Sequence, residues 1–104
     1  MLHPQLILKL TTFDIDFLKD FFSKKPVKRA YLFGSYSRDN VDEESKIDIL
    51  VELDYAKPIG LGFIQMKYEL EDSLHKTVDL VSERSVSKHI LSFLIKDKIL
   101  IYEK

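Results

Sequence analysis

The sequence YLFGSYSRDNVDEESKIDILVEL, residues 31–53, joins two apolar segments through a Gly-Ser turn and a polar loop. Gly34 ends the first apolar segment, where glycine allows a tight turn and lets a ligand approach the backbone. Ser35, at the expected start of a helix, would offer a hydroxyl and backbone N–H groups to a phosphate. Asp48 stands in the second apolar segment, where an acid is costly unless it is paired. The pattern suggests nucleotide and metal chemistry, and Lys46 is the residue that argues against it.

The composition is that of a globular domain. The chain has 104 residues, 45% of them hydrophobic and 32% charged, which fits a single domain over 1–104 with residues 1–10 as a candidate arm. We expect no membrane span, because no apolar run approaches about 20 residues, and no signal peptide, because a basic region and a cleavage site are missing. The absence of cysteine excludes disulfides and fits a cytoplasmic location. The net charge of -1 gives no bulk reason for nucleic-acid binding.

Apolar periodicity predicts helices that alternate with strands. Phe13, Phe17 and Phe21 recur every four residues, which indicates an amphipathic helix whose aromatic side chains enter the core. The last helix would be capped by Ser82 or Ser85 and would direct four apolar side chains inward: Val86, Ile90, Phe93 and Leu94. The predicted helices cover 13–22, 35–38, 61–74 and the segment after 85, and the predicted strands cover 27–33, 47–53, 77–81 and 99–102. This alternation predicts an α/β fold, with helices packed on a sheet.

Two acids in these strands are candidates for a shared site. Lys46 and Asp48 should project to the same face, with their Cα atoms roughly 7 Å apart. Asp79 in the third strand would reach the same place if that strand lies beside the second. Carboxylates that converge near a phosphate suggest Mg²⁺, which prefers oxygen ligands and could align a nucleophile. Either acid alone could instead be a structural, ion-paired side chain, but together with the Gly-Ser turn they favour the metal site.

The segment LFGSYSRDNVDEESKIDILVEL resembles the signature of the minimal nucleotidyltransferases, small members of the polymerase-beta-like superfamily. That signature combines a Gly-Ser turn, an Ala-Arg-Gly segment and a Ser-Asp-x-Asp-Leu segment. Val78-Asp79-Leu80-Val81 is similar to the family's later strand with its third acid, and the closing segment 99–102 is similar to the family's C-terminal end. The resemblance covers nearly all of the chain after about residue 11.

The resemblance implies a nucleotidyltransferase fold, which is α/β (α+β in some schemes), with a small mixed sheet flanked by helices. It implies Mg²⁺-dependent transfer of a nucleoside monophosphate, such as AMP, from ATP or another NTP. Gly34, Ser35 and Arg38 would bind the nucleotide, Asp48 and Asp79 would bind metal, and Asp79 would activate the acceptor hydroxyl. Many such proteins are antitoxins paired with a helical HEPN-type protein, and some attach AMP to it.

Three positions depart from the family pattern. Lys46 replaces the first metal-binding aspartate, Asp39 replaces the glycine after Arg38, and a glycine common before the third strand is replaced in the region 75–76. The change at Lys46 is the serious one, because it gives the site a formal charge of -1 instead of -3. Repulsion between an ammonium and a nearby metal ion is several kcal/mol at an effective dielectric constant of about 20.

Several functions therefore stay open. The first is an antitoxin-like module with weak or absent catalysis, in which Lys46 could pair with Asp48 and Asp79 in place of an ion. The second is an active enzyme, with one metal on Asp48 and Asp79 or with help from the nearby acids Asp42, Glu43 and Glu44. The third is an otherwise active lineage in which Lys46 is a natural or engineered inactivating change. Nucleic-acid binding rests only on the basic cluster at 24–29. Homo-oligomerisation could use residues 1–10 or the last helix.

Overall fold

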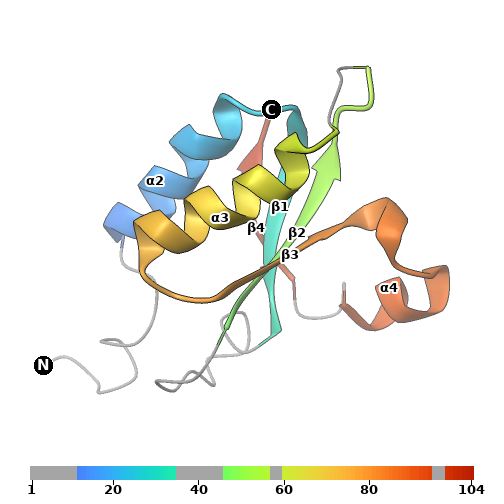
Figure 1. The fold of residues 1–104 in the computed structure, drawn as a ribbon. Coiled ribbons are helices and arrows are strands. Elements are labelled where there is room, and N and C mark those ends of the chain that lie inside the picture. Colours follow the sequence, from blue (N-terminus) through green and yellow to red (C-terminus); the bar gives the residue numbers. More distant parts are fainter. Residues whose placement is uncertain (1–11, 35–45, 57–59, 95–97) are drawn as a thin grey trace, which may run out of the picture.

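A computed structural model describes residues 12–34, 46–56, 60–94 and 98–104 (Figure 1). These residues form a four-stranded sheet of β1 (Val27–Phe33), β2 (Ile47–Leu53), β3 (Val78–Ser82) and β4 (Ile99–Glu103) in the order β3-β2-β1-β4. β1 pairs antiparallel with β2 and β4, whereas β2 and β3 are parallel. The helices are α2 (Thr12–Ser23), α3 (Gly62–Leu74), the 3₁₀ turn η2 (Glu83–Ser85) and α4 (Lys88–Leu94). The mixed sheet with packed helices confirms the predicted α/β class.

The predicted elements are confirmed to within one or two residues, with one exception. A capping role for Ser82 or Ser85 at the last helix is wrong, because η2 and a short extended segment separate both serines from α4. Ser85 Oγ instead donates a hydrogen bond to the Ser82 carbonyl oxygen at 2.8 Å. The predicted helix over 35–38 and the arm over 1–10 lie outside the described residues, and the single-domain assignment stays a prediction.

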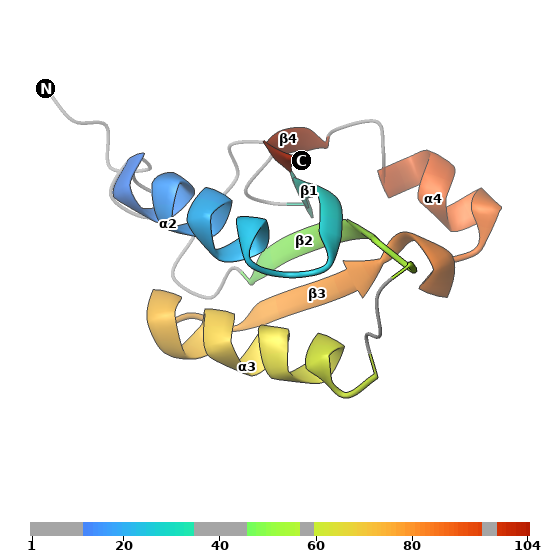
Figure 2. The ribbon, with the colours of Figure 1, turned by 90° about the horizontal axis from the view of Figure 1, so that it is seen from above.

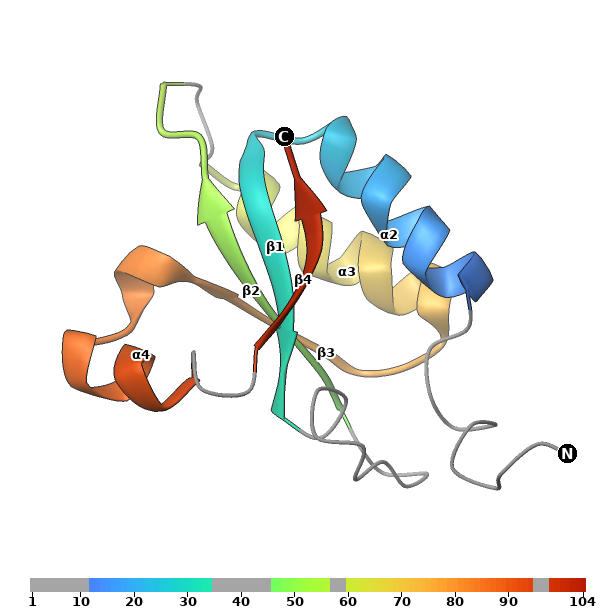
Figure 3. The ribbon, with the colours of Figure 1, turned by 180° about the vertical axis from the view of Figure 1, so that it is seen from behind.

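α2 and α3 cover one face of the sheet, where the main core lies. Figure 3 shows the strands in front of these two helices, and Figure 2 shows the two helices side by side along the same face. Strand residues that alternate along β2 meet side chains from both helices. Burial of each large side chain contributes about 1.5–3 kcal/mol. The fully buried members include Leu18, Phe22, Ile47, Ile49, Val51, Leu70 and Val78.

Phe13 does not join this core, contrary to the expectation from the Phe13/Phe17/Phe21 repeat. Its side chain is 80% exposed, whereas Phe21 is buried and Phe17 is partly buried against the core. At 3.6 residues per turn, Phe13 lies about 140° around the helix from the fully buried Leu18. A strict repeat of four residues therefore drifts away from the buried face over two turns.

α4 lies on the opposite face of the sheet, over a smaller cluster. Leu91 of α4 packs against the buried side chains of Tyr31, Phe33 and Leu50. Val86, which was expected to face inward, is half-buried, and the other three side chains expected there lie outside the description. This second face, from which Asp48 also projects, is the one that carries the candidate site.

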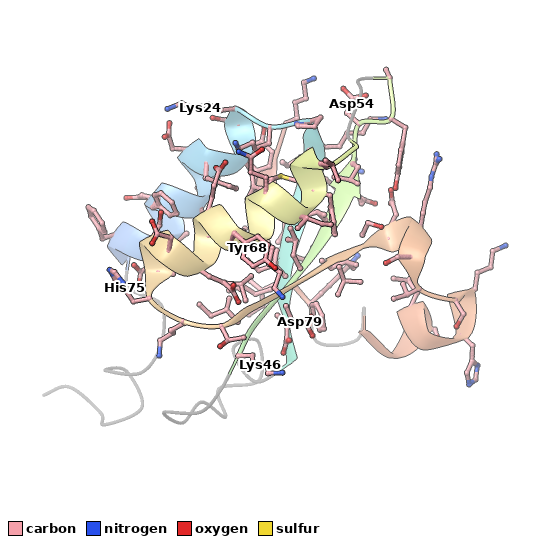
Figure 4. All side chains as sticks on the ribbon, viewed as in Figure 1. Lys24, Lys46, Asp54, Tyr68, His75 and Asp79 are labelled. Atoms are coloured by element: carbon pink, nitrogen blue, oxygen red, sulfur yellow. The ribbon has the colours of Figure 1, made fainter. Side chains whose placement is uncertain are left out.

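His75 takes the place of a glycine at the end of α3 (Figure 4). It adopts the left-handed conformation, with φ of 55°, and its N–H donates to the Glu71 carbonyl oxygen at 2.9 Å. Glycine is the usual residue at this position, because it has no Cβ to strain. The departure from the family pattern near 75–76 therefore costs local strain but leaves the turn into β3 intact.

Candidate nucleotide and metal site

Asp48 and Asp79 are register partners on the adjacent parallel strands β2 and β3. Each is the second residue of its strand and lies between two buried apolar neighbours, so both side chains project from the face opposite α2 and α3. Asp48 is half-buried and Asp79 is exposed. The predicted neighbour relation between the second and third strands is confirmed, and it places the two carboxylates side by side.

Backbone contacts fix the start of both strands. The N–H of Ile47 donates to the Thr77 carbonyl oxygen at 2.9 Å, which aligns β2 with β3 one residue before the two acids. The N–H of Val78 donates to Glu71 Oε2 at 3.0 Å. Glu71 belongs to α3, so this helix anchors the strand residue that precedes Asp79. The sequence pattern did not identify Glu71 as a residue that positions the site.

Gly34 lies directly against the carboxylate of Asp48. It follows β1, whose last residue, Phe33, is the register partner of Asp48. Its φ of +68° lies in the left-handed region, and a Cβ added there would overlap Asp48 Oδ2. Only glycine allows both the turn and this close approach. Gly34, Asp48 and Asp79 therefore form one row across the ends of three strands.

Lys46 sits at the same end of the sheet, just before β2, as Figure 4 shows together with Asp79. Its side chain is exposed. The expected ion pair is not formed, because among the described side chains no salt bridge joins Lys46 to Asp48 or to Asp79. Lys46 therefore shares this end of the sheet with the two acids but forms no salt bridge with them among the described side chains. The physical reason is that Lys46 is exposed: water hydrates its ammonium, and an exposed ion pair contributes little to the free energy of folding.

The described residues fit a metal ion only in part. Asp48 and Asp79 supply the oxygen ligands that Mg²⁺ prefers, and they come from adjacent strand positions. Within the described residues, no three acidic or histidine side chains gather into a metal-binding group. By the family resemblance, Lys46 stands where a further carboxylate is expected. The donor set is therefore smaller and less negative than the three-acid set that the family pattern implies.

Other predicted site residues cannot be placed. Ser35, Arg38 and the acids at 42–44 lie outside the described residues, so their nucleotide or metal roles stay predictions. The roles proposed for Gly34, Asp48 and Asp79 also stay predictions, although their positions are now known.

The far end of the same sheet face carries an ionic network that sequence inspection missed. Arg29 Nε donates to Glu103 Oε2 at 2.6 Å, and Arg29 Nη1 donates to Glu52 Oε2 at 3.1 Å, which links β1, β2 and β4. These two hydrogen bonds raise the pKa of Arg29. Burial, followed by the charge of Glu52, raises the pKa of Tyr31 and of Glu83. Arg29 had been grouped with the basic cluster at 24–29, and cross-strand pairing is visible only once the register is known.

Comparisons with known proteins identify the family and agree with the fold. The family described as "Polymerase beta, Nucleotidyltransferase" matches residues 16–104. A Methanocaldococcus jannaschii relative, MJ0435, named as a candidate protein adenylyltransferase, is 46% identical over 77 residues, which cover 74% of this chain and 76% of that protein. Protein adenylyltransferase MntA of Thermococcus cleftensis is 33% identical over 75 residues, covering 72% of this chain and 75% of MntA. The chain belongs to the polymerase beta nucleotidyltransferase family, and its resemblance to the minimal members is confirmed.

Solved structures show the same fold. A toxin-antitoxin crystal structure with AMP-PNP aligns with a TM-score of 0.75 at 23% identity, covering 88% of this chain and 74% of that one. A second aligned structure is a tri-AMPylated Shewanella oneidensis HEPN toxin in complex with an MNT antitoxin. Its TM-score is 0.68 at 21% identity, covering 91% of this chain and 74% of that one. At these identities the structures show a common fold alone.

Proposed function

We propose that this chain is an antitoxin-like partner of a helical HEPN-type protein, and that Lys46 has weakened or abolished its nucleotidyl transfer. The observation that supports the proposal is that Lys46, which the resemblance aligns with a metal-binding acid, is exposed at the start of β2, at the same end of the sheet as Asp48 and Asp79. The partner is inferred from the relatives named protein adenylyltransferases and from the complex of an MNT antitoxin with a HEPN toxin. Such a pair would act in the cytoplasm, and within the described residues no helix is long and apolar enough to cross a bilayer.

The physical basis is the charge of the site. An ammonium a few ångströms from a divalent cation opposes its binding by several kcal/mol at an effective dielectric constant of about 20. Each 1.4 kcal/mol corresponds to about tenfold in affinity. Binding to a partner protein does not need the metal ion, whereas nucleotidyl transfer, the chemistry of the family, needs it to neutralise phosphate charge. A protein that keeps the fold but lacks a metal ligand is therefore expected to act by binding a partner through its surface.

Calorimetry with ATP, with and without Mg²⁺, tests the catalytic half of the proposal. The wild-type chain should bind ATP weakly and without dependence on Mg²⁺, and Lys46→Asp should gain Mg²⁺-dependent affinity. Lys19→Asp, an equal charge change on the exposed side of α2, should leave ATP binding unchanged. Micromolar, metal-dependent binding by the wild-type chain would contradict weakened catalysis.

Co-purification with the helical protein encoded beside this gene tests the partner half. An R-x4-6-H motif in that neighbour would identify it as the HEPN type. We expect a stable complex that suppresses the neighbour's toxicity. Failure of the two purified proteins to associate would remove the antitoxin role while leaving the family assignment intact.

An active enzyme is the second candidate, and the register of Asp48 with Asp79 is the observation that favours it. In that case Mg²⁺ and an NTP, most simply ATP, would be used to transfer a nucleoside monophosphate to a protein or another hydroxyl acceptor. Asp48 would hold the metal, and exposed Asp79 would accept the proton of the acceptor hydroxyl. Incubation of labelled ATP with the co-expressed neighbour separates the candidates. Label on the neighbour that is lost in Asp79→Asn would favour the enzyme.

A further inference from the structure

Asp79 lies beside Asp48 at an electrostatic cost, so the pairing of β3 with β2 has to be held in place. The two carboxylates are register partners on adjacent strands, and their negative charges repel each other. Lys46 stands just before β2 and forms no salt bridge with either acid among the described side chains. A shift of β3 by two residues would bring Asp79 beside Lys46 and Val81 opposite Asp48. Such a shift would replace a repulsion with an attraction.

The alternation of buried and exposed residues along β3 does not exclude this shift. A shift by one residue would turn Asp79 into the core, because successive strand residues point to opposite faces. A shift by two residues keeps Leu80 on the core side and Val81 on the other face. β3 is an edge strand that pairs with β2 in the parallel manner, which is slightly less stable per residue. The register therefore needs a further determinant.

Glu71 of α3 supplies that determinant. Its Oε2 accepts a hydrogen bond from the N–H of Val78 at 3.0 Å. On the other side of the same peptide group, the Thr77 carbonyl oxygen accepts a hydrogen bond from the N–H of Ile47 at 2.9 Å. The peptide group between Thr77 and Val78 is therefore held from both sides, by α3 and by β2, although it leads into an edge strand. Because Val78 is fully buried, its N–H would be costly to leave without an acceptor.

The connection between α3 and β3 leaves little slack for a shift. The backbone carbonyl oxygen of Glu71 accepts from the N–H of His75 at 2.9 Å, which closes the end of α3, and its side chain holds Val78 seven residues further along the chain. Residues 75–77 alone join the two elements. Figure 4 shows His75 at the end of α3 and Asp79 on the strand that follows. A shift of two residues, roughly 7 Å at 3.3 Å per residue, would break the hydrogen bond to Glu71.

We propose that Glu71 is a positioning residue of the candidate nucleotide and metal site, and that its hydrogen bond to Val78 sets the register in which Asp79 lies beside Asp48. The inference rests on the proposed function only in taking these two acids as the acids of that site. Glu71 touches neither nucleotide nor metal. It acts through the backbone, by keeping the second carboxylate next to the first against the attraction of Lys46.

Disulfide formation between introduced cysteines measures this register directly, because the chain has no cysteine of its own. Asp48→Cys/Asp79→Cys places the two Cα atoms about 4.8 Å apart, within the range of about 4.4–6.8 Å that a disulfide needs. Asp48→Cys/Val81→Cys places them about 8 Å apart, beyond that range. In the full chain the first pair should oxidise readily, and the second should oxidise about tenfold more slowly or not at all.

Substitutions of Glu71 in the first cysteine pair test its role. Glu71→Ala should slow oxidation by about tenfold or more, because a disulfide tolerates little change in separation. Glu71→Asp keeps the charge but is one methylene too short to reach Val78, so it should slow oxidation in the same way. Glu71→Gln keeps a carbonyl oxygen at the same reach, and its rate should stay within about threefold of the parent pair. The Val78 amide should exchange faster with solvent in the first two variants and stay protected in the third.

Leu74→Ala is the matched control, because Leu74 is also partly buried near the end of α3. It lowers stability without removing the acceptor from Val78, so the oxidation rate of the first pair should not change. Oxidation of the second pair that appears only with Glu71→Ala would show the shift toward Lys46.

The outcomes are distinct. If Glu71→Ala leaves the rate of the first pair unchanged, or if Leu74→Ala slows it as much, the positioning role is overturned. If the first pair does not oxidise even with Glu71 in place, the register and the role of Glu71 are both wrong. These measurements use no nucleotide, metal or partner protein. The antitoxin role therefore stands or falls by co-purification, whatever the result for Glu71.

Discussion

Gly34 and Asp48 are coupled by direct contact, and this coupling predicts the effect of adding a single methyl group. Gly34→Ala would force a non-glycine residue into the left-handed region, which costs about 1–2 kcal/mol. It would also displace the Asp48 carboxylate, whose Oδ2 occupies the place of the new Cβ. We expect a loss of stability beyond the conformational cost alone, measured as the free energy of unfolding in urea.

Gly60→Ala is the matched control for this prediction. Gly60 has a φ of +44°, but a Cβ added there meets nothing within 4 Å. Gly60→Ala should therefore lower the free energy of unfolding only by the cost of the left-handed conformation. Equal destabilisation of the two variants would show that the contact between Gly34 and Asp48 is unimportant.

Sequence patterns could identify the members of the candidate site but not all of their relations. The spacing from Gly34 to Asp48 and the Val-Asp-Leu-Val segment were sufficient to select Asp48 and Asp79 as candidates, but their adjacency depended on a strand order that only the structure supplies. The behaviour of Lys46 could not be predicted in this way, because ion pairing depends on the side-chain path and on hydration. Glu71 was also missed, since an acid that accepts a backbone N–H from another element leaves no periodic signal.

Among the secondary-structure elements, α3 has one set of apolar residues that is buried and another, beginning at Leu61 just before the helix, that is exposed. Leu70 is fully buried against the sheet, whereas Leu61 is 83% exposed. Leu70→Ala should lower the free energy of unfolding by about 2–5 kcal/mol, because it removes buried contacts and leaves a cavity. Leu61→Ala should change it by less than about 0.5 kcal/mol. Urea unfolding of both variants checks this, and a large loss for Leu61→Ala would mean that the exposed set is needed for folding.

In the C-terminal part of the chain, the start of the helix and the helix residues that face the sheet were harder to predict than the strands. Strands β1 and β2 have dense apolar sequences bounded by clear turns, so their limits follow directly from the sequence. The segment after β3 contains several serines, each a plausible cap, and the choice among them depends on where the chain turns over the sheet. Leu91, which was not among the residues predicted to face inward, packs against the Tyr31–Phe33–Leu50 cluster. Three of the four side chains that were predicted to face inward lie outside the description.

The junction between β2 and η2 should make stability depend on pH through Glu83. Burial and the nearby charge of Glu52 raise the pKa of Glu83, with Arg84 acting in the opposite direction. A raised folded-state pKa favours the folded protein below the ordinary glutamate pKa of about 4.3, and this contribution is lost as pH rises through the folded value. Glu83→Gln should therefore be more stable than wild type at pH 7, and the difference should shrink toward pH 4.

Urea unfolding of Glu83→Gln and wild type across that pH range checks the sign. A variant that is less stable than wild type at pH 7 would indicate that ionised Glu83 is stabilised, for example by Arg84, whose guanidinium stacks 3.7 Å from the ring centroid of Tyr55. If the substitution acted through packing alone, the difference in the free energy of unfolding between the two proteins would be the same at every pH.

In the whole molecule, the sheet separates the candidate nucleotide site from α2 and α3. α2 and α3 cover one face, and the Asp48–Asp79 row projects from the other (Figure 2). We therefore propose that association with a partner does not require an intact acidic row. This separation distinguishes a protein that neutralises its partner by association from one that must modify it.

The double variant Asp48→Asn/Asp79→Asn tests that distinction. Both substitutions preserve side-chain size, and they remove the carboxylates to which an active enzyme would owe metal binding and proton transfer. We expect the affinity for the helical partner to stay within about threefold of wild type, because the proposed association does not require the carboxylates. We also expect the variant to suppress the partner's toxicity in co-expressing cells as wild type does. If the complex forms but toxicity returns, then association is insufficient, and the acidic row performs chemistry on the partner despite Lys46.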